Sequence, residues 1–392
     1  MTPLRLTTFD RTCTAAETFD RVAPLLPAFG ITRVARHTGL DRIGIPVWCA
    51  YTPNARSIVV AQGKGATDAD ARTSAVMEAL ERAVACDPAV AVLTASLAAL
   101  KARGQAFHPL SGLVASGHEP LAPDDETDWV EGRDLLTGEP VLLPLQAVTL
   151  DRTIRNGRYW QSSDGLASGN TLDEAIFHGL MERVERDAHA LWQLRALGAR
   201  LATCVSPSDF DCPVIRALEG QIAAAGLVLR LFDATSDLGI PCFSAYLGPE
   251  ASRLAGALKH VDVTFGAGTH PVPRQAALRA ITESAQSRLT YISGARDDVF
   301  PEDYDRPLAD STRQAMLAEP RAWTPSTLPA SSGAALIDAL HAGGAGLMIA
   351  ARLSRPDLPF AVAKVLAPAL ENPEGKRRQR YGTRALRQAL TQ

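Results

Sequence analysis

A short β-prone run that leads through glycines into a long helical segment occurs three times along the chain. The runs are SIVVAQGKG, SSDGLASGN and HVDVTFGAGTHP, and the residues after each carry apolar side chains at helical spacing. We expect the chain to turn at Gly63 and Gly65 before the first helix, and at Gly266, Gly268 and His270 before the third. This repeated plan predicts an α/β (α+β) protein with mixed β-sheets around buried helices.

Two of these helices have recognisable starts. Thr67 or Asp68 suits the N-cap of the first and Thr171 that of the second, because their side-chain oxygens can accept a backbone N–H bond from the first turn. The segment 300–335 is rich in Pro, Asp and Ser, which favours loop and surface helix. The third helix carries one polar stripe, formed by Arg279, Glu283, Gln286 and Ser287.

Composition narrows the class of protein. Of 392 residues, 46% are hydrophobic and 21% are charged, which is the profile of a folded chain with a sizeable core. A formal charge of −3 and the lack of any long Lys/Arg run argue against nucleic acid as a partner. No signal-peptide pattern and no long uninterrupted apolar stretch is present, so we expect a cytoplasmic protein that does not enter a membrane.

The pentapeptide ExxER occurs twice, as EALER at 78–82 and as ERVER at 182–186. A helix places residues i and i+3 on one face, so each copy presents two carboxylates side by side with an arginine beyond them. If the two helices face each other, four carboxylates form one acidic cluster that only a cation makes stable. Magnesium fits such oxygen ligands, with phosphate completing its shell. The predicted ligands are Glu78, Glu81, Glu182 and Glu185.

The same pattern has a simpler explanation. ExxER can decorate the solvated faces of two amphipathic helices with ion pairs between residues four apart. Two observations favour a site: both helices are rich in apolar residues around the charges, and both follow glycine-rich segments. Arg82 and Arg186 are then suited to phosphate oxygens. The chain has no GxxxxGK[ST] loop and no GxGxxG turn, so a nucleotide site here would be unconventional.

Five blocks in order resemble the YcaO family: GIPV at 44–47, GKGAT at 63–67, SAVMEALER at 74–82, SSDGLASGNTLDEAIFHGLMERVERDA at 162–188 and RAITESAQSRLTYISGARDD at 279–298. The resemblance implies a YcaO fold, with ATP and Mg²⁺ bound between helices whose glutamates hold the metal. It also implies an enzyme that phosphorylates a backbone amide oxygen of a peptide, after which phosphate is lost. The domains expected are a lead-in or capping segment at 1–40, a catalytic domain at 41–372 and a helical tail at 373–392.

Carried over position by position, the resemblance makes the four ExxER glutamates the metal ligands, in agreement with the helix-face argument. Where the family usually has asparagine the chain has Asp164, so an extra negative charge is expected near the phosphates. His178 lies between Glu174 and Glu182, and we expect a hydrogen-bonded neighbour of the site rather than its base. The resemblance assigns phosphate or nucleotide contacts to Lys64, Ser74, Arg82, Glu174, Arg186, Gln286 and Arg288.

The nucleophile that attacks the activated amide decides the product: a thioamide, an azoline, an amidine or a cut bond. The chain ends GTRALRQALTQ, without the PxPxP tail of typical cyclodehydratases, and shows no fused leader-binding domain. It resembles stand-alone members that form thioamides on a ribosomal precursor peptide or protein with a TfuA-like partner. An azoline-forming cyclodehydratase is the second interpretation, peptide-bond cleavage stays open, and a non-catalytic peptide-binding scaffold is the interpretation from another class. The apolar tail also allows a homodimer.

Overall fold

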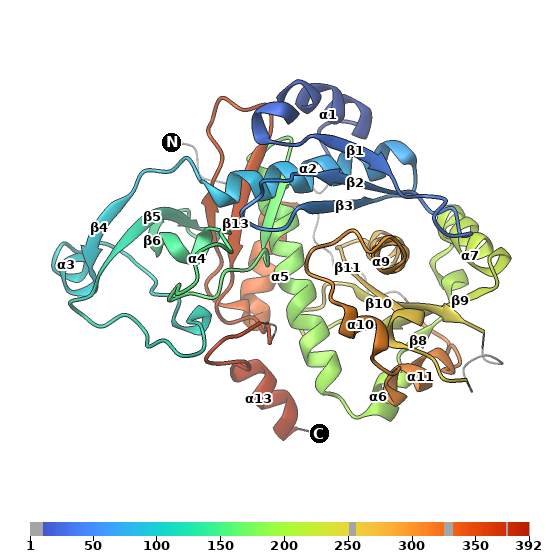
Figure 1. The fold of residues 1–392 in the computed structure, drawn as a ribbon. Helices are drawn as coiled ribbons and strands as arrows, with labels where there is room; N and C mark the ends of the chain where they lie inside the picture. The colour runs from blue at the N-terminus through green and yellow to red at the C-terminus, as the bar shows by residue number, and fades with distance from the viewer. Residues whose placement is uncertain (1–10, 251–255, 325–331, 374, 392) are drawn as a thin grey trace.

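The computed structural model describes residues 11–250, 256–324, 332–373 and 375–391. Its described strands form three sheets, and every ladder between them is antiparallel. Long helices lie against these sheets: α2 (Asp68–Cys86), α5 (Leu172–Leu194) and α9 (Pro273–Ser293), as Figure 1 shows. The α+β arrangement of sheets around buried helices is therefore confirmed.

The two smaller sheets lie on either side of α9 (Figure 1). The first contains, in order, β1 (Arg33–Arg36), β2 (Val47–Tyr51) and β3 (Val60–Lys64). The second contains β11 (Thr264–Thr269), β10 (Cys242–Pro249), β9 (Leu227–Asp233) and β8 (Cys204–Val205). Helix α2 covers β2 and β3, whereas α9 packs mainly on β11 and β10.

The largest sheet joins segments far apart in the sequence. Its order is β4 (Leu93–Ser96), β5 (Glu126–Asp134), β12 (Ile349–Arg352), β13 (Ala361–Leu366) and β7 (Leu166–Gly169), and β6 (Pro140–Pro144) pairs with β5. Helix α5 packs on β7 and β13, and Ile176, Leu180 and Val184 bury its apolar face. Because β7 also contacts α2, this edge of the sheet brings α2 and α5 together.

The predicted helix starts are confirmed. The side chain of Thr67 accepts a hydrogen bond from the backbone N–H of Asp70, and the side chain of Thr171 accepts one from Glu174, each at 3.2 Å. These bonds satisfy N–H groups that the first helical turn leaves without a partner. Both long ExxER helices are thereby fixed at the end nearest the glycine-rich segments.

The turns predicted at Gly63, Gly266 and Gly268 are wrong, because these glycines lie inside strands β3 and β11. A Cβ atom on Gly63 would stand 2.1 Å from the carbonyl oxygen of Ala71, and one on Gly268 would stand 2.2 Å from that of Ala276. The glycines therefore allow a helix backbone to lie directly on a strand. A local sequence pattern that looks like a turn is in fact a signal of close strand–helix packing.

The N-terminal lead-in contains α1 (Ala15–Val22), the 3-10 segment η1 (Ala23–Phe29) and β1, so it supplies a strand to the first sheet. The segment 300–335 contains short helices as expected, α10 (Pro301–Asp305) and α11 (Asp310–Met316), while its residues 325–331 lie outside the described part. The predicted helical tail contains α13 (Thr383–Leu390).

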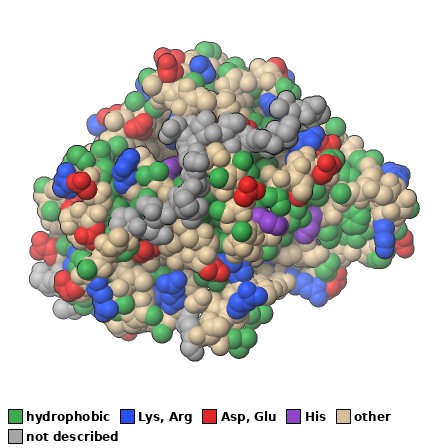
Figure 2. All heavy atoms as spheres, turned by 180° about the vertical axis from the view of Figure 1, so that it is seen from behind, with side chains coloured by type: hydrophobic (Ala, Val, Ile, Leu, Met, Phe, Trp, Pro, Cys, Tyr) green, Lys and Arg blue, Asp and Glu red, His purple; other side chains and the backbone are tan. Residues whose placement is uncertain are grey.

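The remaining helices are short or connect the sheets. They are α3 (Leu97–Ala102), α4 (Leu145–Val148), α6 (Leu197–Leu201), α7 (Pro213–Ala224) and α12 (Gly333–Leu340), with single turns η2 (Ser111–Leu113), η3 (Pro207–Phe210), η4 (His260–Asp262) and η5 (His341–Ala345). No helix among the described residues combines the length and apolarity needed to cross a bilayer. Charged side chains of both signs are scattered over the face in Figure 2.

Candidate functional site

A cavity of about 260 Å³ opens between α2, β7, α5 and α9. We call it the glutamate cavity, because Glu78, Glu81, Glu182 and Glu185 all line it. Each helix contributes two carboxylates from positions three residues apart, as the spacing predicts. The two ExxER motifs thus meet in one site, which the alternative of two separate solvated faces does not allow.

Three carboxylates of this cavity are harder to ionise than usual in the absence of a cation, because burial raises the pKa of Glu81, Glu182 and Glu185. Burial raises the pKa of Glu81 well above its usual range, and the neighbouring Glu78 carboxylate adds to the rise. Burial and the nearby Glu283 carboxylate raise the pKa of Glu185 to about 7. Glu185 is only 7% exposed. A divalent cation would relieve this crowding of negative charge.

Glu78 and Glu182 accept hydrogen bonds from nearby donors. Arg82 donates to Glu78 at 2.7 Å from the next helical turn, and Arg186 donates to Glu182 at 3.4 Å in the same way. The backbone N–H of Gly165 also donates to Glu182, at 3.2 Å.

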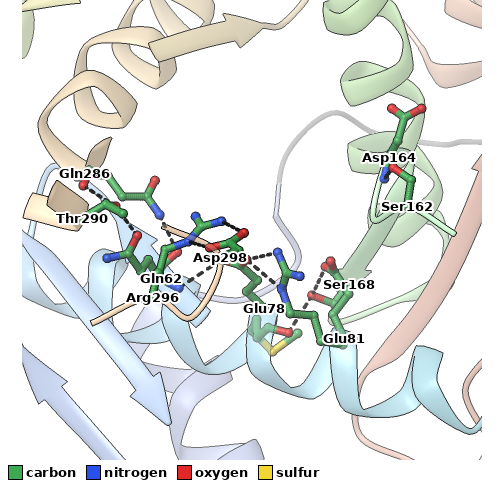
Figure 3. Close-up of polar contacts among 12 residues, drawn as sticks. Gln62, Glu78, Glu81, Ser162, Asp164, Ser168, Gln286, Thr290, Arg296 and Asp298 are labelled. Atoms are coloured by element: carbon green, nitrogen blue, oxygen red, sulfur yellow. Dashed lines mark hydrogen bonds and ion pairs between the residues drawn. The ribbon is translucent and has the colours of Figure 1, made fainter. Parts of the chain in front are cut away.

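Glu81 receives one bond from a neighbouring strand. The Ser168 hydroxyl donates to Glu81 at 3.2 Å, and Figure 3 shows the two side chains facing each other. Three carboxylates of α2 and α5 are thus held by donors on their own helices or by Ser168 on strand β7.

The cavity also contains cationic side chains suited to an anionic ligand. Lys64, at the end of β3, forms an ion pair with Glu283 of α9. Burial opposes ionisation of Glu283, but the ammonium group of Lys64 holds the pKa of this carboxyl below its usual value. Arg11, Arg186 and Arg279 also line the cavity. Guanidinium and ammonium groups close to carboxylates match a ligand made of phosphates and a metal ion.

The donor set fits magnesium that is shared with a phosphate ligand. As placed, no group of three or more His, Cys, Asp or Glu side chains in the described ranges could hold a metal ion on its own. Mg²⁺ is commonly bound by only one or two carboxylates, with water and substrate phosphates as the other ligands. The glutamate pairs on α2 and α5 supply carboxylates in that number.

Four of the seven residues assigned to phosphate or nucleotide contacts line this cavity, namely Lys64, Ser74, Glu174 and Arg186. The other three do not line it. Arg82 pairs with Glu78 and lines a smaller cavity near Cys86, and Arg288 pairs with Asp41 at 3.3 Å. Gln286 donates to the backbone carbonyl of Gln62 at 2.7 Å.

Asp164 lies on the opposite side of the site from Gln286 (Figure 3). Its carboxylate points away from Glu81 and accepts hydrogen bonds from Arg183 and Asn372. Although burial opposes ionisation, the charges of Arg183 and Lys364 hold the pKa of Asp164 below its usual value. The structure therefore places this negative charge in a neutralised cluster outside the glutamate cavity.

Glu174 is anchored by the lead-in segment. Thr12 donates to it through its backbone N–H at 2.6 Å and through its hydroxyl at 2.5 Å, while the backbone of Asn170 donates to the other oxygen at 2.9 Å. These bonds outweigh burial and lower the pKa of Glu174. The lead-in thus reaches the site and places Arg11 in its wall.

His178 lines the cavity, but its Nδ1 has no hydrogen-bond partner in the described chain. Burial lowers the pKa of His178 well below its usual value, and Arg279 and Arg11 add to this, so the imidazole is neutral. The expectation of a hydrogen-bonded neighbour is not met at Nδ1. A neutral imidazole at this place is free to bond a ligand.

Several lining residues were not among the predicted nucleotide contacts: Arg11, Ser168, Asn170, Arg279 and Glu283. The polar stripe on the third helix contains two of them, Arg279 and Glu283, and signalled that α9 faces the site. Nothing in the local pattern connects Thr12 with Glu174 or Lys64 with Glu283, because these contacts join residues far apart in the chain.

Residues 62–371 match the family model described as YcaO cyclodehydratase, ATP- and Mg²⁺-binding. A protein of Rhizobium leguminosarum bv. trifolii, described as lying in the tfuA 3′ region, is 39% identical over 92% of this chain and 89% of its own length. A protein of Methanothermobacter thermautotrophicus is 37% identical over 74% of each chain. The span of the family-model match, residues 62–371, contains both ExxER motifs.

Solved structures share the fold. One titled as YcaO from Methanopyrus kandleri bound with AMPPCP and Mg²⁺ has a TM-score of 0.69 at 21% identity, over 95% of this chain and 97% of that one. Another, titled as a heterocyclase in complex with substrate and cofactor, has a TM-score of 0.75 at 23% identity; this chain spans 55% of its length. Identities this low support the architecture alone. The chain, by its sequence match, belongs to the YcaO cyclodehydratase family of ATP- and Mg²⁺-binding enzymes.

Proposed function

We propose that this protein uses ATP and Mg²⁺ to activate a backbone amide of a ribosomal peptide or protein substrate, and that it forms a thioamide with a TfuA-like partner. One observation carries the proposal. Glutamates from two ExxER helices line one buried cavity together with Lys64, Arg186 and Arg279. This arrangement suits a triphosphate and its metal ion far better than an uncharged ligand.

The anionic and the cationic residues of the glutamate cavity would bind different parts of the ligand. The ExxER glutamates would hold Mg²⁺, since carboxylate oxygens are its preferred protein ligands. Lys64, Arg186 and Arg279 would hold phosphate oxygens, and Ser74 adds a hydroxyl in the same wall. Bound ATP would supply the phosphoryl group that turns the amide oxygen into a leaving group. The low exposure of Glu185, 7%, strengthens its contact with a cation.

The genetic position of one relative supports the thioamide over other products. That relative, 39% identical to this chain, is described as lying in the tfuA 3′ region. In thioamide formation hydrosulfide adds to the amide carbon and the oxygen leaves as phosphate, so sulfur replaces oxygen and ADP is released. Described cysteines of this chain are free, but none lines the glutamate cavity, so the sulfur would come from an external donor.

The test is a reconstituted reaction followed by mass spectrometry. The protein, a TfuA-like partner, ATP, Mg²⁺, sulfide and peptides encoded beside the gene are combined, and each peptide is weighed. Exchange of one oxygen for sulfur supports the proposal. The family description as a cyclodehydratase keeps azoline formation as the second candidate, and loss of one water from the peptide would establish it instead. A cut peptide would identify a protease-like reaction, and an unchanged peptide with no ATP consumed would contradict the proposal.

A further inference from the structure

A second cavity, of about 430 Å³, is lined in large part by the C-terminal segment 371–387, and we call it the tail cavity. Other parts of its wall come from the turn η2, the segment 160–164, helix α5 and the end of β13. None of the four ExxER glutamates lines it, so a ligand bound here would not share the metal and phosphates of the glutamate cavity. Its volume is in the range of sites that enclose small ligands.

Cationic side chains outnumber carboxylates in the wall of the tail cavity, six to three. The cations are Arg183, Lys364, Arg377, Arg380, Arg384 and Arg387, and the carboxylates are Asp164, Asp237 and Glu371. Some of this charge is already paired, because Arg183 bonds Asp164, and Arg384 bonds both Asp237 and Asp187. Three of the cations, Lys364, Arg380 and Arg387, form no ion pair within the described ranges of the chain. The wall therefore offers positive charge to an anionic group.

The buried part of this positive charge centres on Lys364. Its side chain donates to one backbone carbonyl, and the residue is only 4% exposed. Two further buried cations, Arg183 and Arg377, face the single carboxylate of Asp164. Burial lowers the pKa of Lys364 to about 8, and although the charges of Asp164 and Glu182 oppose this, those of Arg183 and Arg377 add to it. An anion beside Lys364 would offset a buried charge that is otherwise costly.

The same wall contains a hydrogen-bond acceptor that is not used. Asp164 is 9% exposed, and Arg183 and Asn372 both donate to its Oδ2. Its Oδ1 is buried and has no hydrogen-bond partner among the described residues. A buried polar atom without a partner is costly, so such an atom in a cavity wall indicates a ligand that donates a hydrogen bond. The ligand would thus carry an anionic group for Lys364 and an N–H or O–H group for Asp164.

The remaining wall is apolar, which argues against a small inorganic anion as the ligand. Its apolar side chains are Leu110, Leu113, Trp160, Leu366 and Leu370. An inorganic ion would fill little of the cavity and leave this apolar surface in contact with water. The last residue of a peptide carries a carboxylate, an N–H group close to it and a side chain that can be apolar. These three groups match the cations, the acceptor and the apolar surface of the tail cavity.

We propose that the tail cavity binds the C-terminal residue of a peptide or protein. The carboxylate of that residue bonds Lys364, its N–H group donates to Oδ1 of Asp164, and its apolar side chain packs against the leucines of the wall. This site is a docking point for a chain end and is separate from the amide that the enzyme activates. It stands without the proposed function, because no residue of the glutamate cavity takes part in it.

The experiment is fluorescence anisotropy with matched peptides that carry fluorescein at the N-terminus and are titrated with the full chain. The first is fluoresceinyl-glycyl-glycyl-leucine with a free carboxylate, and the second is its leucinamide. The third ends in leucic acid, which replaces the last N–H group by an ester oxygen. We expect the free acid to bind at least about tenfold more tightly than the amide, because the amide lacks the charge that bonds Lys364. The ester should bind at least about threefold more weakly than the free acid, because Asp164 then lacks its donor.

Two variants test whether this binding takes place in the tail cavity. Lys364→Met removes the buried charge, and Gly112→Trp fills the cavity from the turn η2, where an added Cβ meets no atom within 4 Å. Each should weaken binding of the free acid at least about tenfold. The matched control is Gly220→Trp on α7, which lines neither cavity and where an added Cβ also meets nothing within 4 Å. Circular dichroism checks the folding of all three variants, and Gly112→Trp decides alone if Lys364→Met does not fold.

Three results would overturn the proposal. They are no binding of the free acid, equal binding of the acid and the amide, and unchanged binding of the acid in the folded cavity variants. Displacement of the free acid by an equal concentration of inorganic phosphate would overturn it as well, because the cavity would then select a small anion. Binding of Mg²⁺–ATP is measured separately by calorimetry, so failure of the proposed function and failure of this inference are distinguishable.

Discussion

Two cavities have lining residues on α5, the glutamate cavity and the tail cavity, yet they are built differently. The glutamate cavity is made by regular elements, three helices whose backbones lie on glycine-containing strands, and its charges are carboxylates that lack full compensation. The tail cavity is made mostly by loops and the C-terminal segment, and its cationic side chains outnumber its carboxylates. Rigid elements position charges for a metal and phosphates more precisely than loops do.

The largest expected effect tests the glutamate cavity. Glu81→Gln or Glu185→Gln should lower ATP turnover in the reconstituted reaction at least about 100-fold, because losing one ligand disturbs metal and phosphate together. Phosphate release measures it, and Glu302→Gln on the exposed α10 is the matched control. Turnover near the wild-type rate in both cavity variants would show that the glutamate cluster is not part of the active site.

A second prediction concerns the strand–helix spacing that shapes the glutamate cavity. Gly268→Ala places a Cβ 2.2 Å from the Ala276 carbonyl oxygen, so it should lower the free energy of unfolding by at least about 2 kcal/mol. Gly220→Ala, in open space on a helix, should instead stabilise by up to about 1 kcal/mol. Urea denaturation of the two variants measures both free energies of unfolding. Equal stability would mean that the glycine is not required by packing.

A lysine variant and an arginine variant test which cationic side chains contact the phosphates. Lys64→Met, in the glutamate cavity, should weaken Mg²⁺–ATP binding about tenfold, since a cation near phosphate contributes about 1–2 kcal/mol. Arg288→Met lies outside and should change the affinity less than about twofold. Calorimetric titration compares them. The reverse order of effects would place the phosphates on the other side of α9.

The smallest effect on the nucleotide is expected at Asp164, in the neutralised cluster outside the glutamate cavity. Asp164→Asn removes the charge that Arg183 and Arg377 face, so the free energy of unfolding should fall by about 1–3 kcal/mol. Mg²⁺–ATP affinity should stay within about twofold, because Asp164 does not line the glutamate cavity. A much tighter nucleotide complex in Asp164→Asn would show instead that this carboxylate repels the phosphates.

Much of the glutamate cavity could be predicted from the sequence because helical periodicity is a local signal. Spacing alone paired Glu78 with Glu81 and Glu182 with Glu185, and the N-caps Thr67 and Thr171 were visible as residue types. The same argument could not say that two helices face each other. The resemblance supplied that step, and the shared cavity supports the facing arrangement of the two helices.

The failures have a common physical cause. Gly63, Gly266 and Gly268 look locally like turns, but their role is to admit a helix that packs on them from elsewhere in the chain. The tail cavity joins segments near 112, 164, 364 and 380 that share no motif. Tertiary contacts of this kind leave no periodic trace, so neither the cavity nor the bond from Thr12 to Glu174 could be predicted.

The most direct test of the central claim is calorimetric binding of ATP to the purified protein, with Mg²⁺ present and with Mg²⁺ removed by EDTA. The account predicts tight binding that requires Mg²⁺ and is lost in Glu81→Gln. Binding of equal strength in EDTA, or in Glu81→Gln, would contradict the assignment of the glutamate cavity as the site of ATP and its metal ion.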